Sequence, residues 1–428
     1  MATPASPEFL RSLFKVATDA ALPNVCVAQH LPAKPKGRTI VVGAGKAAAA
    51  MARAVEDHWE ADVEGVVVTR YGHAVPTNKI EVLEASHPVP DQAGVDASKR
   101  ILETVQGLSE DDLVLCLISG GGSALLSLPA EGITLEDKAK FTDQLLRSGA
   151  TITEMNCVRK HLSMIKGGRL AMACHPARVV SLIISDVPGD DLSSIASGAT
   201  VPDPSSYADA LAVIDKYNID APAAIKALLK AAPDETPKPG DPRFDGVENV
   251  LIATPQMSLE AAAMAAEAAG YTPMILSDRI EGESRDVAEV HAAIARQVVA
   301  HGQPLKAPAV LLSGGETTVT LRGKGGRGGR NAEFLLALAV SLDGHAGVHA
   351  IACDTDGIDG SEDNAGAVIG PETLARGADA GLYAKAYLAN NDAYTYFQGI
   401  NDLVMSGPTL TNVNDFRAIV IEAIVNER

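Results

Sequence analysis

Four cations and five glycines lie close together between Arg322 and Arg330. The cations are Arg322, Lys324, Arg327 and Arg330, and no acidic residue interrupts them. Proteins bind anions with mobile positive charge and with backbone N–H groups that no side chain shields, and glycine leaves the backbone open in this way. Because the whole chain has a formal charge of -18, this local exception indicates a site for phosphate or carboxylate.

Two glycine-rich turns are predicted to follow buried strands. Each begins with serine and glycine after an apolar run, so successive backbone N–H groups can point into one concavity that holds a phosphate. The first turn has three consecutive glycines, which lower the stability of the fold. Their presence is better explained by the close approach of a ligand than by a wide turn alone. The similarity of the two turns can also be coincidence. Their residues are Ser119, Gly120, Gly121, Gly122 and Ser123 in the first, and Ser313, Gly314, Gly315 and Glu316 in the second.

Lys46 lies in a third glycine-rich segment, at the predicted start of a helix. The segment fits G-x-G-x-x-A through Gly43, Gly45 and Ala48, which alone is a weak match to a dinucleotide-binding turn. The next predicted strand ends near Arg70, where an acid for the ribose hydroxyls would be expected. A lysine adds its charge to the positive end of the helix, and this favours phosphate or carboxylate binding over a purely structural turn.

The segment 155–172 is predicted to form one helix with two different faces. Leu162 belongs to its apolar stripe, whereas Asn156, Arg159 and Lys160 lie on the other side. A solvated basic face explains this pattern nearly as well as an anion-binding face. The acidic charge of the whole protein favours the anion-binding interpretation, with these three residues as substrate contacts.

Acidic residues follow two further predicted strands. Asp186 and Asp190 come after the strand 179–184, and Asp356 comes after the strand 348–352. Ligands bind at the carboxyl ends of strands in open α/β sheets, and Mg²⁺ takes one or two carboxylates with phosphate oxygens and water. We expect Asp186 and Asp190 to hold Mg²⁺ and Asp356 to accept a proton from a substrate hydroxyl. The alternative is that these aspartates only cap loops.

The overall composition narrows the class of protein. A chain of 428 residues with 46% hydrophobic content can form two sizeable cores. Its 36 basic and 54 acidic residues argue against nucleic-acid binding, and no apolar run approaches the roughly 18 residues of a membrane span. Five scattered cysteines predict a reduced, cytoplasmic protein. The sequence leaves open whether the protein is a homo-oligomer.

Short apolar strands alternate with longer alanine-rich helices, which predicts an α/β fold with largely parallel sheets. The proline-rich segment 231–246 is the best candidate for a linker. We therefore expect a Rossmann-like domain over 1–240 and a smaller α/β domain over 241–428, and it stays open whether the final segment packs on the first domain. The predicted strands are 39–42, 65–69, 113–118, 179–184, 250–253, 273–276, 309–312 and 348–352.

Taken in order, these segments resemble the glycerate 2-kinase family, the class II glycerate kinases with a MOFRL domain at the C-terminus. The resemblance extends over nearly the whole chain and rests on motifs too long for chance. The motifs are GAGKAA, EASHPVPD, LISGGGSALL, NCVRKHLSMIKGGRLA, SDVPGDDLSSIASG, SGGET with GGRNAE, DTDGIDG, and SGPT with TNVND.

The resemblance implies transfer of phosphate from ATP to the 2-hydroxyl of D-glycerate, with Mg²⁺, in a cleft between two α/β domains. It also implies that Lys46 and Arg330 are catalytic, that Asn331 contacts the nucleotide and that Asn414 contacts the substrate. The chain departs from the family pattern at Ala332, where glutamine is usual, and at Leu410, where glycine is usual. Arg322, Lys324 and Arg327 are left as nucleotide contacts or as a solvated flap.

Two other functions remain open at this stage. A hydroxypyruvate reductase would place NAD(P)H at the turn around Gly45, with Arg70 near a 2′-phosphate, but the ribose acid is missing. A non-catalytic sensor of sugar acids would not need so many acids at strand ends.

Overall fold

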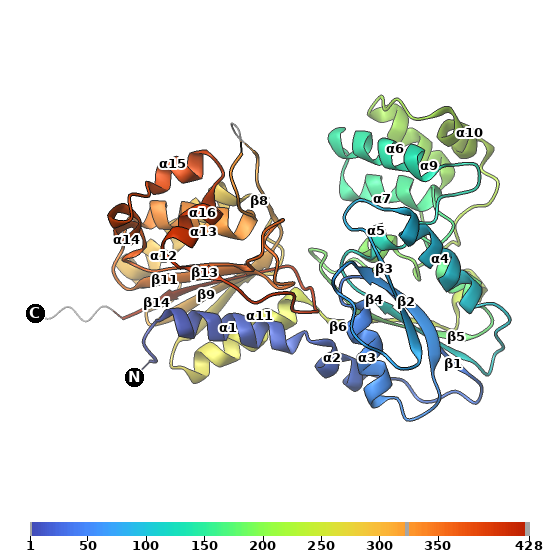
Figure 1. The fold of residues 1–428 in the computed structure, drawn as a ribbon, viewed down its shortest axis with the longest axis horizontal. Coiled ribbons are helices and arrows are strands. Elements are labelled where there is room, and N and C mark those ends of the chain that lie inside the picture. Colours follow the sequence, from blue (N-terminus) through green and yellow to red (C-terminus); the bar gives the residue numbers. More distant parts are fainter. Residues whose placement is uncertain (1, 322–324, 424–428) are drawn as a thin grey trace, which may run out of the picture. The chain divides into compact units, whose positions relative to one another are not determined.

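The computed structural model describes residues 2–321 and 325–423, and it divides into two compact units (Figure 1). The N-terminal unit is Pro23–Ile252. The C-terminal unit joins the residues up to Leu22 with the chain from Ala253 onward. The first residues were expected in the first domain, but they join the second because the apolar face of helix α1 (Pro7–Ala20) packs on that unit's sheet and on α11 (Pro255–Ala268).

A six-stranded sheet forms the centre of the N-terminal unit, in the order β3-β2-β1-β4-β5-β6. The pairs β2–β3, β1–β2, β1–β4 and β4–β5 are parallel. The central strands β1 and β4 are buried along their whole length, as expected for a sheet covered on both faces. The strands are β1 (Thr39–Ala44), β2 (Glu64–Arg70), β3 (Ile80–Ala85), β4 (Leu113–Ile118), β5 (Arg178–Ile184) and β6 (Val247–Ala253).

Two groups of helices stand out in this unit. Helices α4 and α8 pack on one face of the sheet, whereas α6, α7, α9 and α10 share an apolar core of their own (Figure 1). The bounds are α2 (Pro23–His30), α3 (Ala48–His58), α4 (Gln92–Thr104), α5 (Gly122–Leu125), α6 (Leu135–Arg147), α7 (Ile152–His161), α8 (Arg169–Cys174), η1 (Ile195–Ser197), α9 (Tyr207–Lys216), α10 (Ala223–Ala231) and η2 (Pro242–Phe244).

The single helix predicted over 155–172 is wrong. The chain leaves the helix after α7, Ser163 pairs with Pro129 in an isolated antiparallel bridge, and a new helix begins only at Arg169. A continuous helix is also excluded at Gly167 and Gly168, whose φ angles are 58° and 83°, and Gly168 caps the start of α8.

The sheet of the C-terminal unit has the order β13-β12-β11-β14-β9-β7 and is mainly antiparallel. Only the β7–β9 pair of this sheet is parallel, so the expectation of largely parallel sheets is wrong here. The reason is β14, which begins in a segment that looks like a polar loop and then runs between β11 and β9. The strands are β7 (Thr272–Ser277), β8 (Gly282–Glu283), β9 (Ala309–Gly315), β10 (Thr317–Thr318), β11 (Val348–Asp354), β12 (Gly366–Ile369), β13 (Leu403–Val404) and β14 (Asp415–Ile421).

Helices cover both faces of this second sheet (Figure 1). Along β9, Ala309 and Leu311 pack under α12 and α13, while Val310 and Leu312 pack on α1 and α11, which is the period-two alternation of a strand buried on both sides. The bounds are α12 (Ser284–His301), α13 (Arg330–Leu342), α14 (Thr373–Asp379), α15 (Ala384–Ala389) and α16 (Ala393–Gly399). Across the described residues, no helix has the length and apolar character needed to cross a membrane.

Candidate active site

The loops after β1 and β4 lie side by side in the N-terminal unit. These neighbouring strands mark the point where the strand order reverses, which is where open α/β sheets bind ligands. The backbone N–H of Lys46 donates to the carbonyl of Gly120 at 2.8 Å, and the N–H of Ala47 donates to Ser119 Oγ at 3.0 Å. The structure therefore joins the predicted lysine and the predicted glycine-rich turn.

Two glycines allow this close approach. Gly45 has a φ of 142°, and a Cβ there would lie 2.1 Å from Ser119 Oγ. Gly121 has a φ of 78°, and a Cβ there would lie 3.0 Å from His87 Cδ2 and 3.4 Å from Lys46 Cγ. Larger residues would separate the two loops or displace Lys46.

Ser123 connects the same turn with the loop after β5. Its Oγ lies 2.7 Å from Ser197 Oγ, which lies 3.5 Å from Asn156 Oδ1. Ala196 and Ser197 have φ angles of 49° and 55°, and such strained non-glycine backbone costs about 1–3 kcal/mol per residue and concentrates at functional sites. The structure thus places the predicted substrate contact Asn156 beside the glycine-rich turn.

Arg159 and Lys160 lie in different surroundings, although they are adjacent on α7. The Lys160 ammonium is buried 3.4 Å from Asp203 Oδ1. The Arg159 side chain is half-buried, and this burial lowers the pKa of its guanidinium. Lys160 therefore has an internal partner, and its predicted contact with substrate stays a prediction.

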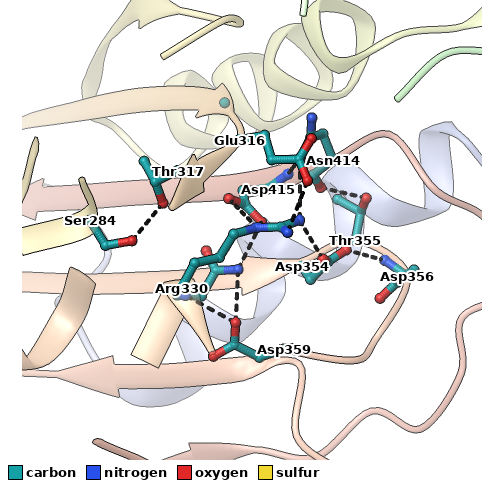
Figure 2. Close-up of polar contacts among 12 residues, drawn as sticks. Ser284, Glu316, Thr317, Arg330, Asp354, Thr355, Asp356, Asp359, Asn414 and Asp415 are labelled. Carbon is teal, nitrogen blue, oxygen red and sulfur yellow. Dashed lines mark hydrogen bonds and ion pairs between the residues drawn. The ribbon is translucent and has the colours of Figure 1, made fainter. Parts of the chain in front are cut away.

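Arg330, the first residue of α13, contacts three carboxylates in the C-terminal unit (Figure 2). Its Nε lies 2.8 Å from Asp415 Oδ1, its Nη2 lies 2.8 Å from Asp354 Oδ2, and its Nη1 lies 3.1 Å from Glu316 Oε1. Asn414 Oδ1 is 3.5 Å from Nη2. Glu316 follows β9, Asp354 ends β11 and Asp415 begins β14, and because these strands are adjacent the sheet itself brings the three acids together.

The charge of Arg330 is therefore matched within the protein. Burial alone would lower the pKa of Arg330, but Asp415, Asp354 and Glu316 together raise it well above its usual value. The sequence predicts a cation available to a substrate anion, whereas the surroundings of this guanidinium carry more negative than positive charge. The sequence could not show this, because the three acids are far apart along the chain.

Asp359 holds the start of α13, where Gly329 offers no capping side chain. Its Oδ1 accepts from the backbone N–H of Asn331 at 3.0 Å, and its Oδ2 accepts from that of Ala332 at 2.9 Å. Asn331, predicted to contact nucleotide, is itself buried and donates from Nδ2 to Asp415 Oδ1 at 2.8 Å. Complete burial raises the pKa of Asp359 to about 6, although the two backbone donors act in the opposite direction.

Arg417 is a residue of this site that sequence reasoning missed. It is two residues after Asp415 on β14, so both side chains share one face of the strand, and its Nη2 lies 2.6 Å from Asp415 Oδ2. Its guanidinium also donates to Thr317 Oγ1 at 3.2 Å, and the whole side chain is buried. A basic residue within an apolar strand was the available signal.

The second predicted Ser-Gly-Gly turn is wrong, because Ser313, Gly314 and Gly315 are the last residues of strand β9. Gly314 O accepts from the Ile280 N–H at 3.2 Å, and Ser313 Oγ lies 3.1 Å from the ring of His291. The Ser313 hydroxyl expected to contact a phosphate is thus engaged within the unit.

Asp356, the predicted base, lies in the loop after β11. Its backbone N–H donates to Asp354 Oδ1 at 3.0 Å (Figure 2). Its own Oδ1 accepts from the Ile358 N–H at 2.8 Å. Asp354 therefore links this loop to Arg330. The role of Asp356 as a base stays a prediction.

Asp186 and Asp190 lie in the loop between β5 and η1. Asp190 has a φ of 57°, and its buried Oδ1 has no hydrogen-bond partner among the residues that the structure describes. Over the same residues, no group of three or more His, Cys, Asp or Glu side chains is arranged to hold a metal. A buried carboxylate oxygen without a partner fits Mg²⁺, which can complete its shell with phosphate and water.

The other cations near Arg330 are only partly described. Arg322 and Lys324 lie outside the described residues. Arg327 donates from Nη2 to Glu362 at 2.6 Å and lies 3.9 Å over the ring of Tyr394. These contacts fix the position of Arg327 and argue against a mobile flap, whereas its other possible role, a nucleotide contact, stays a prediction.

Two family models match the chain. Residues 9–230 match the model described as Domain of unknown function (DUF4147), and residues 309–415 match the MOFRL family.

Relatives match over nearly their whole length. A protein of Thermotoga maritima named D-glycerate 2-kinase is 42% identical over 96% of this chain and 98% of its own. A protein of Agrobacterium vitis named "Putative hydroxypyruvate reductase" is 56% identical over 97% of this chain and 94% of its own. The crystal structure of glycerate kinase from Thermotoga maritima matches with a TM-score of 0.88 at 40% identity, over 97% of this chain and 99% of that chain.

Fold and site define a two-unit α/β protein with a glycine-rich turn beside a lysine in one unit and an arginine–carboxylate cluster in the other. The matches to relatives over nearly the full length identify the family. The chain belongs to the glycerate 2-kinase family, as its motifs predicted.

Proposed function

We propose that this protein transfers the γ-phosphoryl group of ATP to the 2-hydroxyl of D-glycerate, giving 2-phosphoglycerate and ADP. The observation that carries the proposal is the contact between the Lys46 loop and the Gly120 loop at the point where the strand order reverses. The strand order of the first sheet also supports a Rossmann-like description of this unit. The names of the relatives point to the same reaction.

Phosphoryl transfer depends on positioning and charge neutralisation more than on covalent chemistry. In our proposal, the Lys46 ammonium neutralises phosphate oxygens, and the backbone N–H groups of Gly120 and Gly121 hold them, while the N–H of Gly122 already donates to the carbonyl of Ser119 at 3.2 Å. Asp356 accepts the proton that leaves the 2-hydroxyl. Water must be excluded from this site, because it would compete with glycerate for the phosphoryl group.

We propose that Arg330 meets a substrate oxyanion through its Nη1 atom. Glu316, the partner of that atom, is 50% exposed at its side chain, whereas Asp354 and Asp415 are 5% and 0% exposed. An exposed ion pair contributes little, so an oxyanion can replace Glu316 at low cost while the two buried acids keep the guanidinium in place.

Mg²⁺ would be held by Asp190 and Asp186, with the phosphates of the nucleotide as further ligands. When bound, Mg²⁺ would neutralise phosphate charge. The unpartnered Oδ1 of Asp190 supports this assignment. An Asp190→Asn variant should shift the Mg²⁺ concentration for half-maximal activity upward, and an unchanged Mg²⁺ dependence would exclude Asp190 as a ligand.

One assay tests the reaction itself. Purified protein is incubated with D-glycerate, ATP and Mg²⁺, and ADP and 2-phosphoglycerate are measured, while a parallel sample receives hydroxypyruvate and NAD(P)H. Glycerate-dependent ADP formation with 2-phosphoglycerate as the product supports the proposal. Nucleotide oxidation by hydroxypyruvate without ADP formation would instead support the reductase named for the Agrobacterium relative.

A further inference from the structure

Helix α6 buries a lysine where its pattern calls for an apolar residue. Lys138, Phe141 and Leu145 are the buried residues of this helix, spaced three and four apart as in a core-facing stripe. The Lys138 side chain is only 8% exposed, and its Nζ has no hydrogen-bond partner among the described residues. An unpaired buried ammonium is costly, so a structural role alone does not explain it.

Two further cations lie near Lys138. Lys166, in the loop after α7, is buried and donates from Nζ to the carbonyls of Ser123 and Leu126, both at 2.6 Å. Arg159, on α7, is half-buried. We call Lys138, Arg159 and Lys166 the cation triad.

The charges of the triad act on one another. Burial, with the charge of Arg159, lowers the pKa of Lys138 to about 8. Burial, with the charges of Lys138 and Arg159, lowers the pKa of Lys166 well below its usual value. Burial lowers the pKa of Arg159 as well. Among the described residues, no carboxylate contributes to any of these three shifts, in contrast to Lys160, which has Asp203.

The triad also adjoins the glycine-rich turn. Lys166 donates to the carbonyl of Ser123. The Ser123 hydroxyl contacts the Ser197 hydroxyl, which in turn contacts the side chain of Asn156 on α7. Arg159 is one helical turn after Asn156, on the same side of α7. Lys166 thus contacts one end of that turn directly, and Arg159 lies on the side of α7 that reaches the turn through Asn156.

We propose that the cation triad binds an oxyanion of a substrate, either the carboxylate of glycerate or a phosphate of the nucleotide. The proposal rests on the kinase function for the identity of these ligands. Half-buried Arg159 offers a planar fork of donors at the accessible edge, and Lys138 supplies charge behind it. The bound anion takes the place of the carboxylate that the fold does not provide.

The variant Lys138→Met separates binding from structure. Methionine fits the apolar stripe and removes an uncompensated charge, so the ligand-free melting temperature should equal or exceed that of wild type. Affinity should fall at least about tenfold, corresponding to about 1.4 kcal/mol, for either D-glycerate or ADP in calorimetric titration at constant ionic strength. Lys140→Met is the matched control, because Lys140 is on the same helix, 67% exposed at its side chain and paired with Glu136 at 2.7 Å.

The ligand whose affinity falls identifies the oxyanion. A loss for D-glycerate assigns the triad to the carboxylate, and a loss for ADP and for inorganic phosphate assigns it to phosphate. Arg159→Gln should weaken the same ligand, and it provides the test if Lys138→Met does not fold. Wild-type affinity for all three ligands in both variants overturns the proposal.

The outcome is independent of the kinase assay. If wild-type protein forms ADP from glycerate and ATP while both variants bind normally, only the role of the triad fails. If wild-type protein binds phosphate through Lys138 but forms no ADP, the triad stands and the proposed reaction fails.

Discussion

The Nε atom of Arg330 lies 2.8 Å from one carboxylate oxygen of Asp415 and 2.9 Å from the other. Asp415 also pairs with Arg417, and both of these side chains are 0% exposed. One carboxylate thus joins an arginine proposed to meet substrate with an arginine inside the core. Because removing one partner of a buried ion pair leaves the other charge uncompensated, stability and activity are expected to be coupled here.

Arg330→Ala is expected to lower both turnover and stability. Turnover should fall at least about a hundredfold through loss of charge stabilisation. The free energy of unfolding should fall by about 3–5 kcal/mol, because Asp354 and Asp415 stay buried without the guanidinium. Steady-state kinetics and urea unfolding measure the two effects.

Arg330→Lys controls for the charge. It keeps one positive charge but loses the planar fork that reaches three carboxylates, so it should recover part of the stability and little of the turnover. Normal turnover in the alanine variant would remove Arg330 from the mechanism. A loss of stability without a loss of turnover would leave it a structural role only.

Lys46→Ala is expected to act on turnover alone. Its side chain is half-buried and its loop is held by backbone bonds that alanine keeps, so the free energy of unfolding should change by less than about 0.5 kcal/mol. Turnover should fall at least about a hundredfold. Lys79→Ala is the control, because the Lys79 side chain is exposed and its ammonium forms a surface ion pair with Asp62 at 3.0 Å. Equal turnover in both variants would contradict a catalytic role for Lys46.

Gly45→Ala is expected to separate the loops that follow β1 and β4. The new Cβ would lie 2.1 Å from Ser119 Oγ, so the loops must move apart at a cost of about 1–3 kcal/mol beyond the backbone strain. Gly107→Ala is the matched control, because Gly107 has a φ of 67° but no atom within 4 Å of the new Cβ. Nucleotide affinity should fall in the first variant only, as measured by titration with ADP.

Local patterns predicted the parts of the fold that local physics determines. The apolar runs around Val41 and Leu115 identified the buried strands, and the glycines beside Lys46 and Ser119 identified the turns that meet at the first sheet. The sequence could not show what neighbours in space decide. Asp415 looks like part of a polar loop because its partners Arg330 and Asp354 are distant along the chain.

Long-range pairing also explains the other errors. Ser313 and the two glycines after it suggest a turn, but pairing with β14 extends β9 through them. The buried position of Lys138 follows from its place in the stripe of α6, but only the structure shows that this ammonium has no described partner. Charge matching is therefore the property that a single sequence predicts least well at this site.

Asp359 is expected to make the C-terminal unit less stable as pH rises. Burial raises its pKa from the ordinary value of 3.8 to about 6, so the native state keeps a proton that the unfolded chain has already released. The free energy of unfolding should therefore fall between about pH 4 and pH 6 and then level off, by on the order of 2–3 kcal/mol. Asp359→Asn should lack this component in urea unfolding across the window, and an unchanged pH profile would show that Asp359 ionises normally.

His291 is expected to act with the opposite sign over a similar range. It is buried with Nδ1 2.8 Å from the carbonyl of Val287 and Nε2 3.1 Å from Ser313 Oγ, and burial lowers its pKa from 6.5 to about 4. Below about pH 6.5 the unfolded chain binds a proton at this histidine, whereas the native state does not. The contribution of His291 to the free energy of unfolding is therefore complete above pH 6.5 and is lost as the pH falls toward 4. In urea unfolding, His291→Gln should remove the loss of stability that accompanies falling pH. Asp359→Asn should instead remove the loss of stability that accompanies rising pH. If both variants changed the profile in the same direction, one of the two assigned shifts would be wrong.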